Sequence, residues 1–167
     1  SDFMSDNSSA YVSYLWDPNE YINVMLYNFQ NTGDGNTILG ISHMPYAIQN
    51  DSTLAGLETT TARYISKANL RYPHCVSINS LFAYLDEEGR YCESDRYAAA
   101  DHKATYINPS DIVVTLAHEL GHYLGLHHAF SESMSTYDDG SKSITMTDGC
   151  LDSDYCDDTP SYNRIEY

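Results

Sequence analysis

Residues 118–128 read HELGHYLGLHH and contain four histidines, three of which (His118, His122 and His128) stand with Glu119 at spacings that could bind a metal ion. On a helix, residues four apart lie on one face, so His118 and His122 can both reach one metal ion. Gly125 can end that helix in a left-handed turn, after which the chain can bring His128 to the same ion. Three imidazole ligands suit zinc and leave its fourth position open. The spacing therefore predicts a reactive rather than a purely structural metal centre.

Glu119 directly follows the first histidine, where it can take a proton from a metal-bound water instead of binding the metal. The alternative to a metal centre is a helix whose histidines are only packed against other residues or solvated. Because a chance match to all five fixed positions is expected in only roughly one chain in 10⁴ to 10⁵ of this length, we favour the metal centre. His127 is interpreted as a residue on the surface or around the site, not as a ligand.

The flanking residues predict the helix that must carry these groups. Residues 108–111 (NPSD) offer an N-cap, a proline at the first helical position and an acid for the helix dipole. We therefore expect a helix from about Pro109 to Leu124, with its ligand face lining a cleft. Four apolar residues recur at helical spacing and predict a core-facing stripe: Ile112, Val113, Leu116 and Leu120.

Three segments have the composition of β-strands. Residues 21–29 (YINVMLYNF) predict a buried strand, residues 37–44 a second strand that Pro45 ends, and residues 75–84 a third. Gly40 in the second strand would allow a close backbone approach, as an edge strand facing an extended peptide needs, although a glycine in a strand more often marks a bulge.

Two further segments are less regular. Residues 53–70 are interpreted as a loop or a short helix. Residues 131–167 are dominated by Ser, Asp, Thr and Gly, so we expect an irregular C-terminal segment with no second hydrophobic core.

Length and charge limit the partners. A chain of 167 residues is expected to form one domain with a substantial core. Its formal net charge is −16, with only 8 Lys and Arg residues, so nucleic acid and anionic membrane surfaces are poor partners.

No stretch has the apolar length for membrane insertion. Residues 1–9 are polar and contain no signal peptide, so we expect an export signal to lie upstream. Nothing predicts an oligomeric state.

The four cysteines are Cys75, Cys92, Cys150 and Cys156. Three disulfide pairings are possible, and the pairs closest in sequence are Cys75–Cys92 and Cys150–Cys156. A cysteine-based zinc site is the competing interpretation, but the sequence contains no C-x-x-C spacing. We favour disulfides, and hence a secreted or cell-envelope, extracytoplasmic location.

Four segments resemble the metzincin metallopeptidases and, more narrowly, the pappalysin family. Residues 115–130 (TLAHELGHYLGLHHAF) are similar almost throughout to that family's zinc helix and following turn. Residues 17–24 (DPNEYINV) and 39–45 (LGISHMP) resemble two of its strand signatures, and residues 154–160 (DYCDDTP) its D-x-x-x-D-T-P loop.

The resemblance implies a role for each matching residue. The zinc ligands would be His118, His122 and His128, and Glu119 would act as general base and acid. The implied calcium ligands are Asp154, Asp157 and Thr159, with Asp148 and Asp152 as further contributors. Oxygen ligands from a turn suit calcium on physical grounds too, although a solvated polar loop is the alternative.

The implied fold is α+β and metzincin-like: a twisted mixed β-sheet, an active-site helix packed against it, and an irregular C-terminal segment. The implied function is that of a secreted zinc metalloendopeptidase that hydrolyses internal bonds of a protein or peptide substrate. The main alternative is a calcium-stabilised binding or adhesion module with an inactive protease-like fold. A zinc hydrolase acting on something other than protein is a second alternative.

The sequence departs from the family most seriously at one turn, and the family's first helix and strand are also shortened or missing. Pappalysins place a methionine-containing turn after the D-T-P loop, whereas here no methionine follows Pro160, and Met134 and Met146 precede the loop. We therefore expect either a catalytic domain, residues 1–167, that is truncated at both ends or a divergent member whose active-site floor is built differently.

Overall fold

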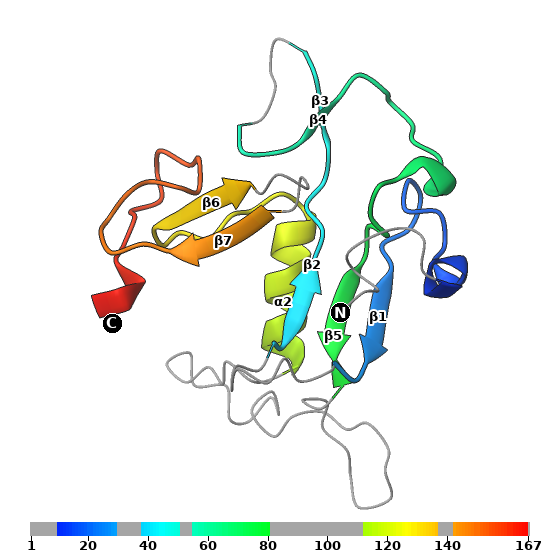
Figure 1. Cartoon of the computed structure of the whole chain (residues 1–167), viewed down its shortest axis with the longest axis horizontal. Coiled ribbons are helices and arrows are strands. Elements are labelled where there is room, and N and C mark those ends of the chain that lie inside the picture. The colour runs from blue at the N-terminus through cyan, green and yellow to red at the C-terminus, as the bar shows by residue number, and fades with distance from the viewer. Residues whose placement is uncertain (1–9, 30–37, 51–54, 81–111, 137–141, 167) are drawn as a thin grey trace, which may run out of the picture. The chain divides into compact units, whose positions relative to one another are not determined.

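The computed structural model describes residues 10–29, 38–50, 55–80, 112–136 and 142–166 (Figure 1). Backbone contacts divide the chain into two compact units. The first comprises residues 1–45 and 62–124, and the second comprises residues 46–61 and 125–167. The described part contains small β-sheets and one α-helix, which confirms the α+β class. The single catalytic domain over residues 1–167 stays a prediction.

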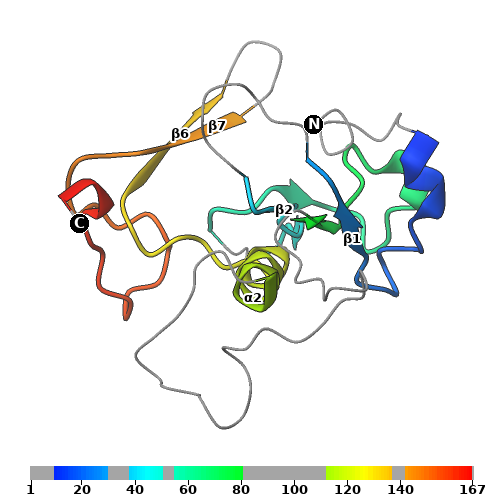
Figure 2. The same cartoon turned by 90° about the horizontal axis from the view of Figure 1, so that it is seen from below.

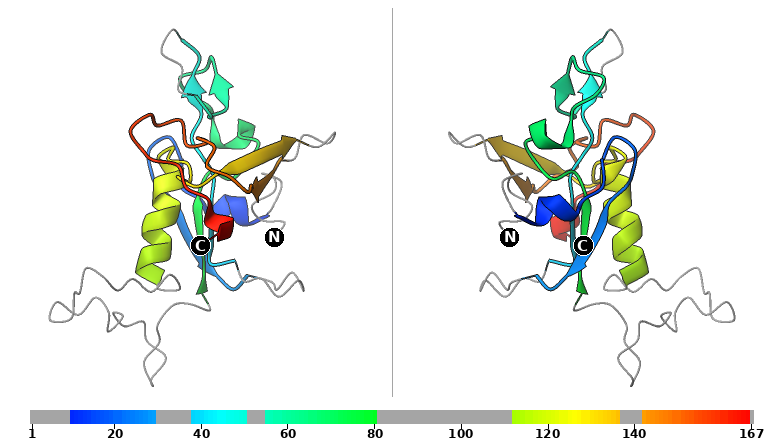
Figure 3. Two further views of the ribbon diagram at one scale, coloured as in Figure 1. Left: turned by 90° about the vertical axis from the view of Figure 1, so that its left-hand side faces the viewer. Right: turned by 90° about the vertical axis from the view of Figure 1, so that its right-hand side faces the viewer.

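The first unit is a three-stranded sheet with the helix against it. Its strands are β1 (Val24–Tyr27), β5 (Val76–Asn79) and β2 (Gly40–Ser42), in the order β1-β5-β2. β1 is parallel to β5, and β2 is antiparallel to it, with Gly40 opposite Ile78. Helix α2 (Ile112–Tyr123) packs on β2 and β5, and Figures 2 and 3 show it on one face of the sheet, running alongside the strands.

The central strand forms the core of this unit. All four β5 residues are buried, and Cys75 just before them packs with Val12 and Leu15. Val12 belongs to a short 3₁₀ helix, η1 (Ala10–Tyr14). A second 3₁₀ helix, η2 (Lys67–Asn69), precedes β5 in the chain. Because β5 is covered on both faces, it provides a rigid base for the strand and helix that flank the candidate site.

Several sequence predictions hold in outline and fail in detail. Strands form within all three predicted segments, but they are shorter. The prediction that residues 21–29 are buried is wrong for β1, where Val24 and Leu26 are 47% and 41% exposed, because β1 lies at a sheet edge and has one open face. The core-facing stripe predicted for the helix is wrong at Val113, whose side chain is 47% exposed. The residues of α2 that are fully buried are Thr115 and Glu119.

The second unit contains two small two-stranded sheets. β3 (Ala47–Ile48) pairs in parallel with β4 (Thr59–Thr60), and β4 lies inside residues 53–70, which were predicted to be a loop or short helix. β6 (Glu132–Thr136) and β7 (Lys142–Met146) form an antiparallel pair, and a short 3₁₀ helix, η4 (Arg164–Glu166), lies near the C-terminus. The prediction of an irregular segment over residues 131–167 is therefore wrong for β6 and β7, which satisfy each other's backbone groups although most of their side chains are polar.

Two other predictions concern export and oxidation. Among the described residues, no helix is both long and apolar enough to cross a bilayer. Cys150 and Cys156 are free thiols, so the predicted Cys150–Cys156 bond is not formed in this structure. Cys92 lies outside the described residues, as does the predicted helix N-cap at residues 108–111.

Candidate metal centre

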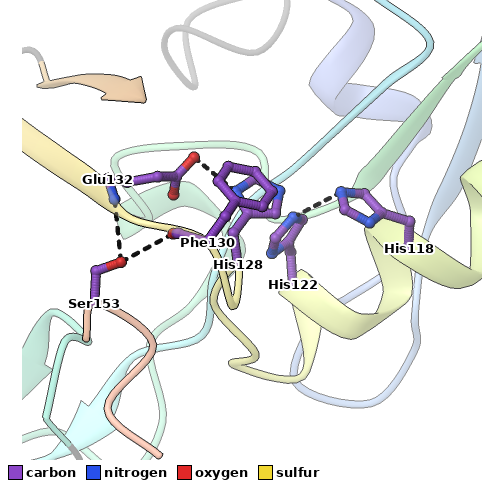
Figure 4. A network of polar contacts seen from close by, with 6 residues as sticks. All are labelled: His118, His122, His128, Phe130, Glu132 and Ser153. Carbon is purple, nitrogen blue, oxygen red and sulfur yellow. Dashed lines mark hydrogen bonds and ion pairs between the residues drawn. The ribbon is translucent and has the colours of Figure 1, made fainter. Parts of the chain in front are cut away.

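His118 and His122 lie on successive turns of α2, as the four-residue spacing predicts (Figure 4). Their Nε2 atoms are 3.0 Å apart, and the two rings meet edge to face with centroids 4.5 Å apart. Two nitrogens bound to one tetrahedral zinc at roughly 2.0–2.1 Å each are about 3.3 Å apart, so these two rings are close to the separation that a shared ion requires.

The helix ends where the sequence predicts. The Leu124 N–H still donates to the carbonyls of Leu120 and Gly121, but α2 stops at Tyr123 and Gly125 has a φ of 100°. A residue with a side chain rarely adopts this conformation, which a glycine adopts without steric cost. Gly125 therefore turns the chain out of the helix three residues before His128.

His128 completes a set of three potential ligands. The ligand atoms of His118, His122 and His128 all lie within 4.8 Å of one another, in one continuous stretch of chain. A set of three imidazoles matches the ligands that catalytic zinc uses, so these residues fit the ion. Within the described part of the chain, His127 is not in this set, and its ring instead packs 5.0 Å from that of Tyr155.

Glu119 is buried on the sheet-facing side of α2 and lies against β2. A Cβ placed on Gly40 would come within 2.6 Å of the Glu119 Cγ and 2.9 Å of its Oε1, so the carboxylate side chain covers the backbone of Gly40. Burial raises the pKa of Glu119 to about 7 in the metal-free chain. A carboxyl group with a pKa near neutrality can both accept and return a proton.

This contact explains Gly40 better than a bulge or a substrate approach alone, and it gives a test. We expect Gly40→Ala to lower kcat by roughly 10- to 100-fold, because the added methyl displaces the carboxylate and small misplacements of catalytic groups are costly. Zinc content should not change. Hydrolysis and bound zinc would be measured beside Val24→Ala, a control at an exposed position of β1, and an unchanged kcat in Gly40→Ala would contradict this role.

The acidic loop is ordered by its own contacts. Asp154 is buried, and its Oδ1 accepts a hydrogen bond of 2.9 Å from the Cys156 N–H. Tyr155 between them has a φ of 61°, which makes the turn tight. Asp157 is exposed and Thr159 is half-buried, with the Thr159 N–H donating to the Cys156 carbonyl. The structure thus shows a turn in which Asp154 is held by the loop itself and Asp157 is exposed, and it does not itself support calcium.

Comparison with known families decides the classification. The family model of pregnancy-associated plasma protein-A, Peptidase_M43, matches residues 64–167, which is more than half of the chain and includes every candidate ligand. The chain belongs to this pappalysin family. Neither a curated protein nor a solved structure gave a significant match. Membership of a metallopeptidase family, together with the three-histidine group, supports zinc as cofactor and peptides as substrates of this pappalysin-family chain.

Sequence reasoning missed two groups at the site. Glu132 makes a 2.9 Å contact with Nδ1 of His128, and Ser153 bonds to the backbone on both sides of Ser131 (Figure 4). The only sequence signal for Glu132 was its position, as an acidic residue four positions after the proposed ligand His128. For Ser153 there was no signal, because its contacts join residues more than twenty positions apart.

Proposed function

We propose that this pappalysin-family chain is a zinc-dependent metalloendopeptidase, with His118, His122 and His128 as zinc ligands and Glu119 as general base. The observation that carries the proposal is the convergence of the three histidines within the family-matched segment, with a buried glutamate beside the first of them. A bound zinc ion would polarise the scissile carbonyl and lower the pKa of a water molecule towards about 7.

Glu119 supplies the proton transfers of this reaction. Its carboxylate takes a proton from the attacking water as the new C–O bond forms, and it returns that proton to the amine as the C–N bond breaks. One water molecule and one peptide bond thus give one carboxyl group and one amine, and no other reactant is needed. The contact with Gly40 fixes the carboxylate on the sheet side of α2, where it cannot swing away from the adjacent His118 without losing that packing.

Strand β2 is the best candidate for binding the substrate backbone. In the described sheet it lies at the edge, paired with β5 along one side only. An extended peptide can add to such an edge through main-chain hydrogen bonds. This position next to Glu119 would hold the scissile bond near the general base, and it agrees with the edge-strand prediction made for residues 37–44.

Calcium binding by the acidic loop is a separate proposal. Saturating calcium, at about 100 times its Kd, would stabilise the fold by about 2.7 kcal/mol, or roughly 5–10 °C in Tm for a chain of this size. We expect that rise in zinc-loaded protein on adding CaCl₂, and its loss in Asp157→Ala, whose exposed side chain is not needed to hold the loop. Thermal denaturation with MgCl₂ as control measures it, and an equal response to both salts or to neither argues against a calcium site.

Secretion also remains a proposal. Its support is the even number of cysteines in the sequence, and the unbonded Cys150 and Cys156 add nothing to it. The endopeptidase itself is tested by digesting a mixed peptide library and mapping the cut bonds. Cuts inside peptides support an endopeptidase, trimming at the ends indicates an exopeptidase, and the absence of cuts favours the alternative of a calcium-stabilised binding or adhesion module.

A further inference from the structure

The third ligand of the proposed zinc site sits in a network of its own. Nδ1 of His128 lies 2.9 Å from Oε1 of Glu132, and both side chains are mostly buried, at 25% and 16% exposure. The carboxylate can only accept a hydrogen bond when it is ionised, so the imidazole must donate from Nδ1. A neutral histidine that donates from Nδ1 presents Nε2 as its metal-binding nitrogen.

The ring of His128 is also fixed in its plane. It stacks on Phe130, with centroids 4.5 Å apart and an angle of 16° between the planes. Phe130 is buried, and the guanidinium of Arg164 covers its ring at 4.6 Å. The stacking limits rotation of the imidazole about its Cα–Cβ and Cβ–Cγ bonds. Stacking and hydrogen bonding together leave His128 one orientation.

Glu132 is in turn held by its backbone. Its N–H donates to Oγ of Ser153 at 3.2 Å, and the same Oγ donates to the Phe130 carbonyl at 3.1 Å. Ser131 between them is buried, with its N–H bonded to the Tyr162 carbonyl and its Oγ–H to the Leu151 carbonyl. The start of the strand at Glu132 is therefore tied to two distant C-terminal segments, one around Ser153 (Figure 4) and one at Tyr162.

We propose that Glu132 is the positioning residue of the third zinc ligand, and that Ser153 holds Glu132 in place. This inference rests on the proposed zinc site. A carboxylate behind a ligating histidine fixes its tautomer and orientation and makes it a stronger ligand, and its loss typically costs roughly 10- to 100-fold in metal affinity. Glu132 does not contact the reacting atoms in this account, so its effect passes through His128.

The test is the zinc Kd of the purified chain, measured by competition with a chromophoric chelator. We expect Glu132→Ala to weaken zinc binding by about 10- to 100-fold and Glu132→Gln to restore most of it, because an amide oxygen still accepts the Nδ1–H bond. Glu20→Ala, which removes an equal charge from an exposed residue, should leave the Kd unchanged. Ser153→Ala should show a smaller loss in the same direction.

A second measurement needs no variant. In zinc-loaded wild-type protein with ¹⁵N-labelled histidine, the NMR spectrum should show His128 bound through Nε2 with a slowly exchanging Nδ1–H. Coordination through Nδ1 would overturn the inference even if Glu132→Ala failed to fold. If His128→Ala loses zinc while Glu132→Ala binds it within twofold of wild type, the inference is wrong and the zinc site stands. If His128→Ala retains wild-type zinc affinity, the zinc site itself fails.

Discussion

Glu119→Gln should lower kcat/KM for peptide hydrolysis by about 10³- to 10⁴-fold, near the upper end of the effect of a general base, while bound zinc stays at the wild-type level. The amide has nearly the shape of the carboxylate and keeps the packing against Gly40, but it cannot take a proton from water. A quenched fluorescent peptide pool gives the rate, and metal analysis of the same samples gives the zinc content.

The pH dependence of folding stability provides a control for Glu119→Gln. Burial raises the pKa of Glu119 to about 7, so above that pH the wild-type chain must ionise a buried carboxyl when no metal is bound. Because the folded state binds this proton more tightly than the unfolded state, metal-free wild type should lose stability as the pH rises from about 4.5 to 7, and the variant should not. A variant that cleaves as well as wild type would contradict the proposed mechanism.

His128→Ala and His127→Ala should differ sharply although the two residues are neighbours. His128 belongs to the group of three ligand atoms, whereas the ring of His127 packs against Tyr155. Removing one of three ligands should weaken zinc binding by at least about 100-fold, more than the loss of an outer partner of a ligand, and hydrolysis should fall with it. His127→Ala should keep both zinc and most activity.

Equilibrium dialysis against buffered zinc measures this pair directly. Thermal denaturation of the metal-free forms shows whether either change disturbs the fold. Equal loss of zinc in both variants would mean that the segment after Gly125, and not His128 itself, carries the effect. Loss in His127→Ala alone would exchange the roles assigned to the two histidines.

The sequence predicted the local parts of the site well because they depend on short-range geometry. The spacing of His118 and His122 determines that they share a helix face, and Gly125 occupies a backbone conformation that glycine favours. These features follow from helix periodicity and steric limits, with no reference to the rest of the chain. The family match confirms the resemblance that these residues carried.

Long-range features could not be predicted in the same way. The exposure of Val24 and Leu26 depends on β1 lying at the sheet edge, which is a property of strand order. The contact of Glu119 with Gly40 joins residues nearly eighty positions apart. β6 (ESMST) and β7 (KSITM) hold only one and two apolar residues among Ser, Thr, Glu and Lys, so their sequence signal is weak and the pairing of their backbones is a long-range feature.

The most direct test of the zinc endopeptidase proposal is digestion of a mixed peptide library by zinc-loaded wild-type chain and by Glu119→Gln, with every new peptide end identified by mass spectrometry. The account predicts new ends inside the peptides with the wild type and almost none with the variant, and no cleavage by zinc-stripped wild type until zinc is returned. Equal cleavage by the two proteins, or none by zinc-loaded wild type, would contradict it.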